Sequence, residues 1–130
     1  MPKFSKTSLL RLSTCDQRLQ KICHEVIKKV DFSVLCGHRT KEDQDLAYAR
    51  GFSKLRYPRS KHNKLPSLAV DLAPWPINWN NIQRFIDLAE VFMAEAKRQK
   101  IKIRWGADWN RNGTWKDEKF RDWPHFELDE

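Results

Sequence analysis

The sequence lacks any apolar run long enough to cross a membrane, because its hydrophobic residues, 40% of the chain, lie in short segments. Its first stretch, Met1 to Leu12, is basic and mixed, without the apolar region and small-residue cleavage site of a signal peptide. We therefore expect synthesis in a cytoplasm and no stable membrane insertion. Any action outside the cell would require an export route supplied by another protein.

Cysteine is scarce and patternless. Cys15, Cys23 and Cys36 are an odd number and form no CxxC metal motif, so we expect reduced, partly buried thiols. The sequence also lacks internal repeats, linkers and low-complexity segments. With 130 residues, it is expected to form a single domain, residues 1–130, with one modest core.

Positive charge is in clear excess. The net charge of +8 and pI of about 9.6 favour a polyanionic partner such as nucleic acid, teichoic acid, lipopolysaccharide or an acidic cell wall. The basic residues are spread from Lys3 to Arg121, which favours steering by the whole surface over a dedicated nucleic-acid helix. No recognisable nucleic-acid-binding motif is present, so we expect no nucleic-acid partner.

Hydrophobic periodicity predicts a small α+β fold with an antiparallel sheet and flanking helices. Apolar residues three and four apart indicate helices, while short alternating or β-branched segments bounded by Gly and Pro indicate strands. The predicted helices run from a cap at Ser13 or Thr14 to Lys29, from a cap at Thr40 to Arg50, and from Asn81, capped by Asn80, to Lys100. The predicted strands are Phe32–Cys36, Leu68–Ala73, Ile101–Trp105 and His125–Asp129, and 51–61 and 106–121 are expected to be loops.

Two histidines and an aspartate are candidate metal ligands. Alternation in the predicted strands places Asp71 and His125 on faces opposite the apolar residues, while His62 lies in the loop before the first of these strands. Two imidazoles and one carboxylate form a three-ligand zinc set that leaves a fourth position for water, as in catalytic sites. The nine residues from His62 to Asp71 exclude a single-helix HExxH arrangement. The alternative is that these are unrelated polar side chains.

Two further residues are candidates for catalysis. Asp122, three residues before His125, is placed to take a proton from a metal-bound water. Arg39 follows a predicted strand end, where its guanidinium would either stabilise a developing oxyanion or lie solvated on the surface. The neighbouring His38 should point away from Arg39, so we exclude it as a ligand. His24 lies off the apolar stripe of its helix and is expected at the surface.

The six tryptophans lie largely in loops around these candidates, which suits a glycan or peptide ligand. Ordinary packing is the alternative, and we prefer it for Trp79 and Trp105.

Four motifs in this order resemble a known family. They are Gly37-His38-Arg39-Thr40 with Gln44, Ser60-Lys61-His62 through Ala69-Val70-Asp71, Trp105-Gly106-Ala107-Asp108-Trp109, and Asp122-Trp123-Pro124-His125-Phe126-Glu127. The sequence resembles the VanY-like zinc peptidases of the D-alanyl-D-alanine carboxypeptidase group, whose fold is hedgehog-like. Within that group it is similar to the phage L-alanyl-D-glutamate endopeptidases that act as endolysins.

The resemblance implies a role for each matching residue. Zn²⁺ would be held by His62, Asp71 and His125, with Asp122 as general base and Arg39 stabilising the oxyanion. Ser60 would support the first ligand or the substrate, and we interpret Glu127 as a partner of a ligand. The segment Asn63–Ser67 stands where many family members have a Gly and a gap two residues shorter, and a longer loop between the ligands can leave their geometry intact.

The implied function is hydrolysis of the L-Ala–D-Glu bond of bacterial peptidoglycan, leading to cell lysis. The implied enzyme is a monomer made in the host cytoplasm and released to the wall through a membrane pore formed by another protein. The alternatives are a D-Ala-D-Ala carboxypeptidase or dipeptidase, and a non-catalytic wall-binding module. Retention of Asp122 and Arg39 argues against the last, because binding alone needs neither.

Overall fold

Residues 2–118 and 121–130 are described by a computed structural model, whose centre is an antiparallel sheet. Within the described residues the strand order is β1-β2-β4-β3. The strands are β1 (Phe32–Cys36), β2 (Ala69–Pro74), β3 (Ile103–Trp105) and β4 (His125–Leu128). The predicted α+β class with an antiparallel sheet is confirmed.

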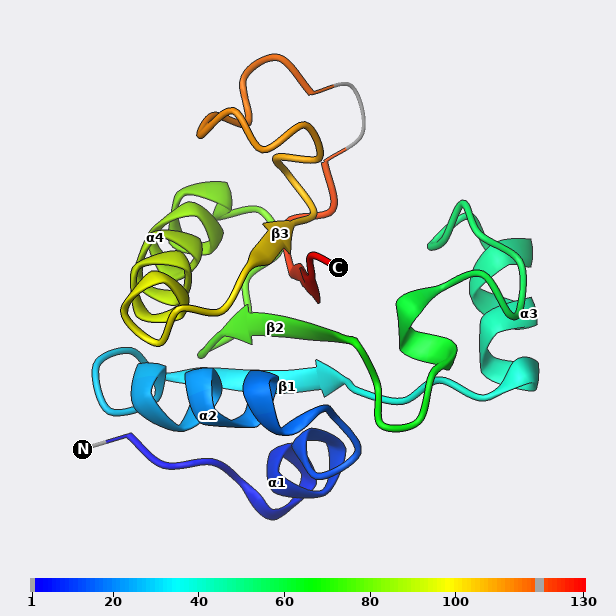
Figure 1. Ribbon diagram of the computed structural model, residues 1–130, viewed down its shortest axis with the longest axis horizontal. Coiled ribbons are helices and arrows are strands. Elements are labelled where there is room, and N and C mark those ends of the chain that lie inside the picture. The colour runs from blue at the N-terminus through cyan, green and yellow to red at the C-terminus, as the bar shows by residue number, and fades with distance from the viewer. Residues whose placement is uncertain (1, 119–120) are drawn as a thin grey trace.

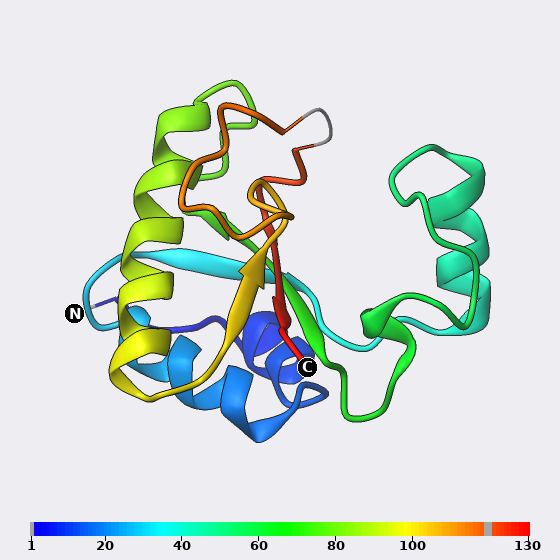
Figure 2. The same cartoon turned by 45° about the horizontal axis from the view of Figure 1, so that its top comes forward.

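The helices divide into two groups (Figures 1 and 2). The first group covers the sheet, with α1 and α4 in contact with strands and α2 packed on α4. By contrast, α3 and a short 3₁₀ helix, η1, form a lobe set apart from that group, beyond the ends of β1 and β2. The helices are α1 (Lys6–Leu12), α2 (Gln17–Val26), α3 (Lys41–Ala49), α4 (Ile82–Arg98) and η1 (Lys61–Asn63).

The hydrophobic core lies between the sheet and the apolar faces of α2 and α4. Phe92 of α4 stacks on Phe126 of β4 with ring centroids 4.2 Å apart, which joins helix and sheet at the centre of the core. The predicted buried stripe of α2 is confirmed, because Leu19, Ile22, Cys23 and Val26 are all fully buried. Among the described residues, no helix combines the length and apolar character needed to span a bilayer.

The prediction that Ser13 or Thr14 caps the helix running to Lys29 was wrong. The chain forms α1 first, and the Ser13 and Thr14 hydroxyls donate back to its carbonyls, those of Leu10 and Arg11, each at 2.6 Å. These hydroxyls therefore close the first helix rather than open the second. The cap of α2 is instead Asp16, whose carboxylate accepts from the backbone N–H of Arg18.

The boundaries of other helices and strands also differ from the predicted ones. Thr40 caps α3 as predicted, but α4 begins one residue late, and Asn81 at its cap position makes no side-chain cap hydrogen bond. At the other end of α4, Lys100 adopts a left-handed φ of 61°, and the N–H of Ile101 returns to the carbonyl of Ala96. This closure uses the residues predicted to start the next strand, so β3 begins at Ile103.

The tryptophan and cysteine predictions had mixed outcomes. Trp105 is buried as expected, whereas Trp79 is 56% exposed and stacks only one face on Phe85. All three cysteines are unpaired, and Cys36 is partly accessible. His24 is exposed, as predicted.

Candidate active site

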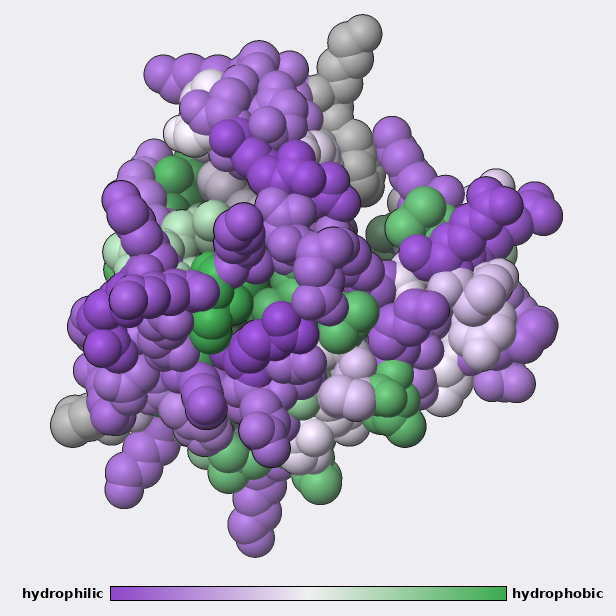
Figure 3. Space-filling view, in the orientation of Figure 1, coloured by the Kyte–Doolittle hydropathy of each residue, from purple (hydrophilic) through white to green (hydrophobic). Residues whose placement is uncertain are grey.

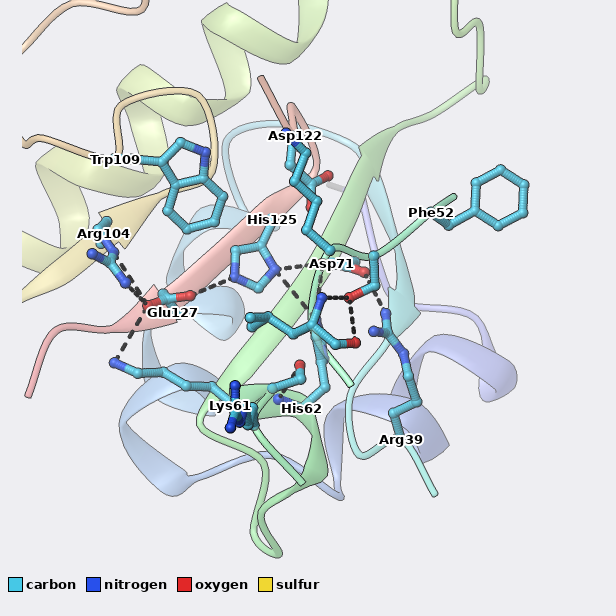
Figure 4. A pocket seen from close by; sticks show the side chains of 15 residues that line it. Arg39, Phe52, Lys61, His62, Asp71, Arg104, Trp109, Asp122, His125 and Glu127 are labelled. Atoms are coloured by element: carbon cyan, nitrogen blue, oxygen red, sulfur yellow. Dashed lines mark hydrogen bonds and ion pairs between the residues drawn. The ribbon is translucent and has the colours of Figure 1, made fainter. Parts of the chain in front are cut away.

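A cleft of about 420 Å³ separates the α3 and η1 lobe from the open end of the sheet. Figure 3 shows this hollow between the lobe and the body of the molecule. One wall comes from residues 52–55 and 59–61, and the other from Arg104, Trp109 and Asp122. Polar side chains from η1, β2 and β4 form the floor, although these elements are far apart in the sequence (Figure 4).

His62, Asp71 and His125 converge on one point of this floor (Figure 4). His62 Nε2 lies 3.1 Å from Asp71 Oδ1 and 3.3 Å from His125 Nδ1, and His125 Nδ1 lies 3.1 Å from Asp71 Oδ1. Ligand atoms about 2.0–2.2 Å from a tetrahedral zinc lie roughly 3.3 Å from one another. The three atoms are therefore spaced as ligands of one small cation would be.

Local structure explains this convergence. Asp71 and His125 are cross-strand partners in the antiparallel pair β2–β4, so their side chains rise from the same face. His62 comes from η1, whose N-terminus is capped by the buried hydroxyl of Ser60, which accepts from the N–H of His62 at 3.2 Å. The His62 carbonyl accepts from the N–H of Arg39 at 2.7 Å, which fastens η1 to the segment after β1.

The outer nitrogen of each imidazole is already committed. His62 Nδ1 lies 2.8 Å from the Gly37 carbonyl, and His125 Nε2 lies 2.8 Å from Glu127 Oε1. Each partner is an acceptor, so each outer nitrogen must donate. In the neutral imidazoles the inner nitrogens then carry lone pairs that face each other and the Asp71 carboxylate. Three acceptors this close together repel unless a cation or protons lie between them, so the donor set fits a metal ion.

The charge balance of the buried cluster agrees with this. Burial would lower the pKa of His62, but the Asp71 carboxylate outweighs it and raises that pKa. Burial would likewise raise the pKa of Asp71, but the two imidazoles hold it well below its usual range. Without a metal the cluster therefore attracts protons, and it favours positive charge at its centre.

Glu127 is the hub of a second set of contacts behind His125. Its Oε2 accepts from Arg104 Nη2 at 2.7 Å and forms an ion pair with Lys61 Nζ at 3.3 Å. Burial would raise the pKa of Glu127, but the hydrogen bond with His125 and the nearby cations lower it to about 2. The carboxylate is thus ionised and fixed, and it orients the His125 ring.

Asp122 lines the cleft beside the cluster, in the segment just before β4. Burial and the charge of Asp71 raise the pKa of Asp122 to about 6, against the opposing effect of the two imidazoles and Arg39. The main chain locks this residue in place, because its N–H donates to the Gly106 carbonyl at 2.8 Å while the Gly106 N–H donates to the His125 carbonyl at 2.7 Å. A half-buried carboxylate with a raised pKa suits a group that accepts and returns a proton.

Arg39 lies on the opposite side of the cluster and is mostly buried (Figure 4). Its Nη2 is 3.5 Å from Asp71 Oδ2, and its Nη1 donates to Gln44 Oε1 at 2.9 Å. The alternative of a solvated surface arginine is therefore wrong. His38 stays outside the cluster, as predicted, because its Nδ1 lies 3.0 Å from the Lys64 carbonyl.

The sequence reasoning missed two residues of the site. Cys36, His62 and Asp71 offer potential metal-ligand atoms within 4.8 Å of one another, so Cys36 adds a metal-type group to the cluster. Cys36 is the cross-strand partner of Asp71. The β1–β2 register is irregular just before this pair, and no sequence pattern predicts that irregularity. Gln44 was noted only as part of a motif, and the Arg39 contact gives it a place in the site.

The cluster, with a carboxylate on one side and an arginine on the other, has the groups of a hydrolytic site. The family model described as phage L-alanyl-D-glutamate peptidase matches residues 1–129. The L-alanyl-D-glutamate peptidase of Escherichia phage T5 is 35% identical, over 97% of this chain and 97% of its own. The chain therefore belongs to the phage L-alanyl-D-glutamate peptidase family, and the resemblance of its motifs is confirmed.

The fold agrees with a solved structure. The L-Ala D-Glu endopeptidase ChiX of Serratia marcescens superposes with a TM-score of 0.76, covering 98% of this chain and 90% of that chain. The sequence identity with that structure is 24%, so this likeness establishes the fold alone.

Proposed function

We propose that this chain is a zinc-dependent peptidoglycan peptidase that hydrolyses the L-Ala–D-Glu bond of the stem peptide. The observation that carries the proposal is the convergence of His62, Asp71 and His125 in the cleft of a chain from this family. When bound, zinc polarises a carbonyl and lowers the pKa of its water to about 7.

The chain's own groups supply the remaining chemistry. Asp122 takes the proton of the attacking water on its carboxylate and returns it to the leaving amine nitrogen. Arg39 directs its guanidinium toward the oxygen on which negative charge develops. Glu127 and the Gly37 carbonyl hold the outer nitrogens of the imidazoles, so that in the neutral rings the lone pairs lie on the inner nitrogens that would bind the metal.

The bond cleaved is tested with a purified muropeptide that contains both L-Ala–D-Glu and a terminal D-Ala-D-Ala. Mass spectrometry of the products should show release of the peptide that begins at D-Glu, with the D-Ala-D-Ala end intact. Loss of a single D-Ala would instead identify a carboxypeptidase. Cleavage of free D-Ala-D-Ala into two alanines, with the muropeptide unchanged, would identify a dipeptidase. If neither substrate were cleaved, only a wall-binding role would remain.

The ligand set is tested by metal content. Protein purified without added metal should contain about one zinc per chain, and His62→Ala or His125→Ala should lose it. Cys36→Ser is the matched comparison, since Cys36 lies near the same atoms. We expect Cys36→Ser to keep its zinc. Loss of zinc in Cys36→Ser with retention in His125→Ala would replace His125 by Cys36 in the ligand set.

The proposal extends to the setting of the enzyme. Residues 1–130 act as one catalytic domain and as a monomer, made in the host cytoplasm and delivered to the wall through a pore formed by another protein. A chain expressed inside host cells that lyses them only after their inner membrane is permeabilised would support this route. Lysis of intact cells from inside without a pore-forming protein would contradict it.

A further inference from the structure

Gln44 on α3 is completely buried although its amide is polar, and each side of that amide has partners. Its Oε1 accepts from Arg39 Nη1 at 2.9 Å and from Asn63 Nδ2 at 3.2 Å. Its Nε2 donates to the Leu55 carbonyl at 2.6 Å and to Ser53 Oγ at 2.9 Å. One side chain thus joins Arg39, the helix that carries His62 and the loop that forms a cleft wall.

These partners fix which way the amide faces. Arg39 and the Asn63 amide nitrogen can only donate, so they require the oxygen of Gln44. The Leu55 carbonyl can only accept, so it requires the nitrogen. A flipped amide would set donor against donor and acceptor against acceptor in a buried place, which is costly. The Gln44 oxygen is therefore held toward Arg39.

The acceptor that Arg39 meets is also neutral. Within the described part of the chain, the other hydrogen-bond partner of the guanidinium besides Gln44 is the Asp71 carboxylate, at 3.5 Å, longer than a good charged hydrogen bond. A carboxylate in place of Gln44 would also accept from Arg39, but it would add a negative charge beside the guanidinium and set an oxygen against the Leu55 carbonyl. An amide positions the guanidinium and leaves its charge to act on the cleft.

We propose that Gln44 is a positioning residue for catalysis, which orients Arg39 toward the developing oxyanion and adds no negative charge beside it. The proposal rests on the proposed function, in particular on the role given to Arg39. Gln44 acts through Arg39 and does not itself contact the substrate.

A double-mutant cycle tests this. Gln44→Met keeps the side-chain length and removes every hydrogen bond, so kcat should fall about tenfold to a hundredfold, the scale of a misplaced catalytic group, with a smaller change in KM. In an Arg39→Ala background, Gln44→Met should lower kcat by less than about twofold, because the guanidinium that Gln44 positions is absent. Zinc content should be unchanged in all four proteins. Gln83→Met, the same change at an exposed position of α4, should have no effect.

Gln44→Glu separates position from charge, and thermal unfolding of both variants identifies any loss of fold. It keeps an acceptor for Arg39 and adds a negative charge, so we expect kcat of the folded protein to fall at least tenfold. Some stability should also be lost, because a carboxylate oxygen replaces the donor to the Leu55 carbonyl. Full turnover of Gln44→Glu would overturn the role of the neutral acceptor. Equal losses from Gln44→Met with and without Arg39 would show that Gln44 only supports the fold, while leaving the proposed function intact. Normal turnover of Arg39→Ala would overturn both this proposal and the role of Arg39.

Discussion

His125 Nε2 and Glu127 Oε1, two residues apart on β4, are joined by a 2.8 Å hydrogen bond on the cleft face of the sheet. The two-residue period of a strand places both side chains on this face, and Arg104 and Lys61 hold the carboxylate from behind. The contact selects the His125 tautomer whose Nδ1 lone pair points at His62 and Asp71. The strand thus encodes both a candidate ligand and the group that orients it.

The first prediction tests this contact. Glu127→Gln keeps the shape but removes the charge that stabilises the His125 N–H, so zinc affinity should fall about tenfold to a hundredfold. Competition with a chromophoric chelator measures that affinity. Glu90→Gln, on the exposed side of α4, is the control and should bind zinc as the parent protein does. Equal zinc affinity in the two variants would limit Glu127 to neutralising Arg104 and Lys61.

The second prediction concerns Asp122. Asp122→Asn removes the proton acceptor but keeps the size and the main-chain bonds to Gly106 and His125, so fold and zinc content should be retained. Muropeptide hydrolysis should fall by roughly a hundredfold or more, the scale of a positioned base. Turnover is measured beside thermal unfolding and elemental analysis. Near-normal turnover would make Asp122 structural and transfer the base to another carboxylate.

Part of this site could be predicted because the residue types are rare and the strand period is simple. His125 and Glu127 share a strand face by alternation alone, and Asp71 meets His125 because neighbouring antiparallel strands align their faces. The α+β class and the apolar stripe of α2 likewise follow from short-range periodicity.

The rest depends on contacts distant in sequence. The pairing of Cys36 with Asp71 depends on an irregular β1–β2 register, and the partners of Gln44 come from a loop and from η1. The start of α2 was misplaced because Ser13 and Thr14 are good caps in either direction, and only the presence of α1 decides between them. No local pattern contains that information.

The third prediction concerns Gly106. A Cβ built on Gly106 would lie 2.8 Å from the Cβ of His125 and closer still to the Asp122 carbonyl oxygen, both backed by main-chain bonds. Gly106→Ala should therefore displace the segment carrying Asp122, lowering the unfolding free energy by about 1–3 kcal/mol and reducing turnover in the folded protein. Denaturant titration and muropeptide kinetics measure the two effects.

Gly51→Asn is the control for that variant. Gly51 has a φ of 78° with nothing within 4 Å of an added Cβ, and asparagine tolerates this left-handed backbone. Gly51→Asn should lower the unfolding free energy by much less than Gly106→Ala does. If Gly106→Ala matched the parent protein in stability and turnover, the backbone would be adaptable here and Asp122 would not depend on this close approach.

The last prediction links the surface charge to the target. A net charge of +8 attracts the enzyme to an anionic wall, and this attraction is screened over about 8 Å at physiological ionic strength. Lysis of permeabilised cells should therefore slow as salt rises from low levels. Cleavage of a small soluble muropeptide should change much less, because it depends on short contacts within the cleft rather than on the field of the whole surface. Rates on both substrates over one salt series separate the two effects. Equal salt sensitivity would mean that the basic surface does not steer the enzyme to the wall and that salt acts on the cleft itself.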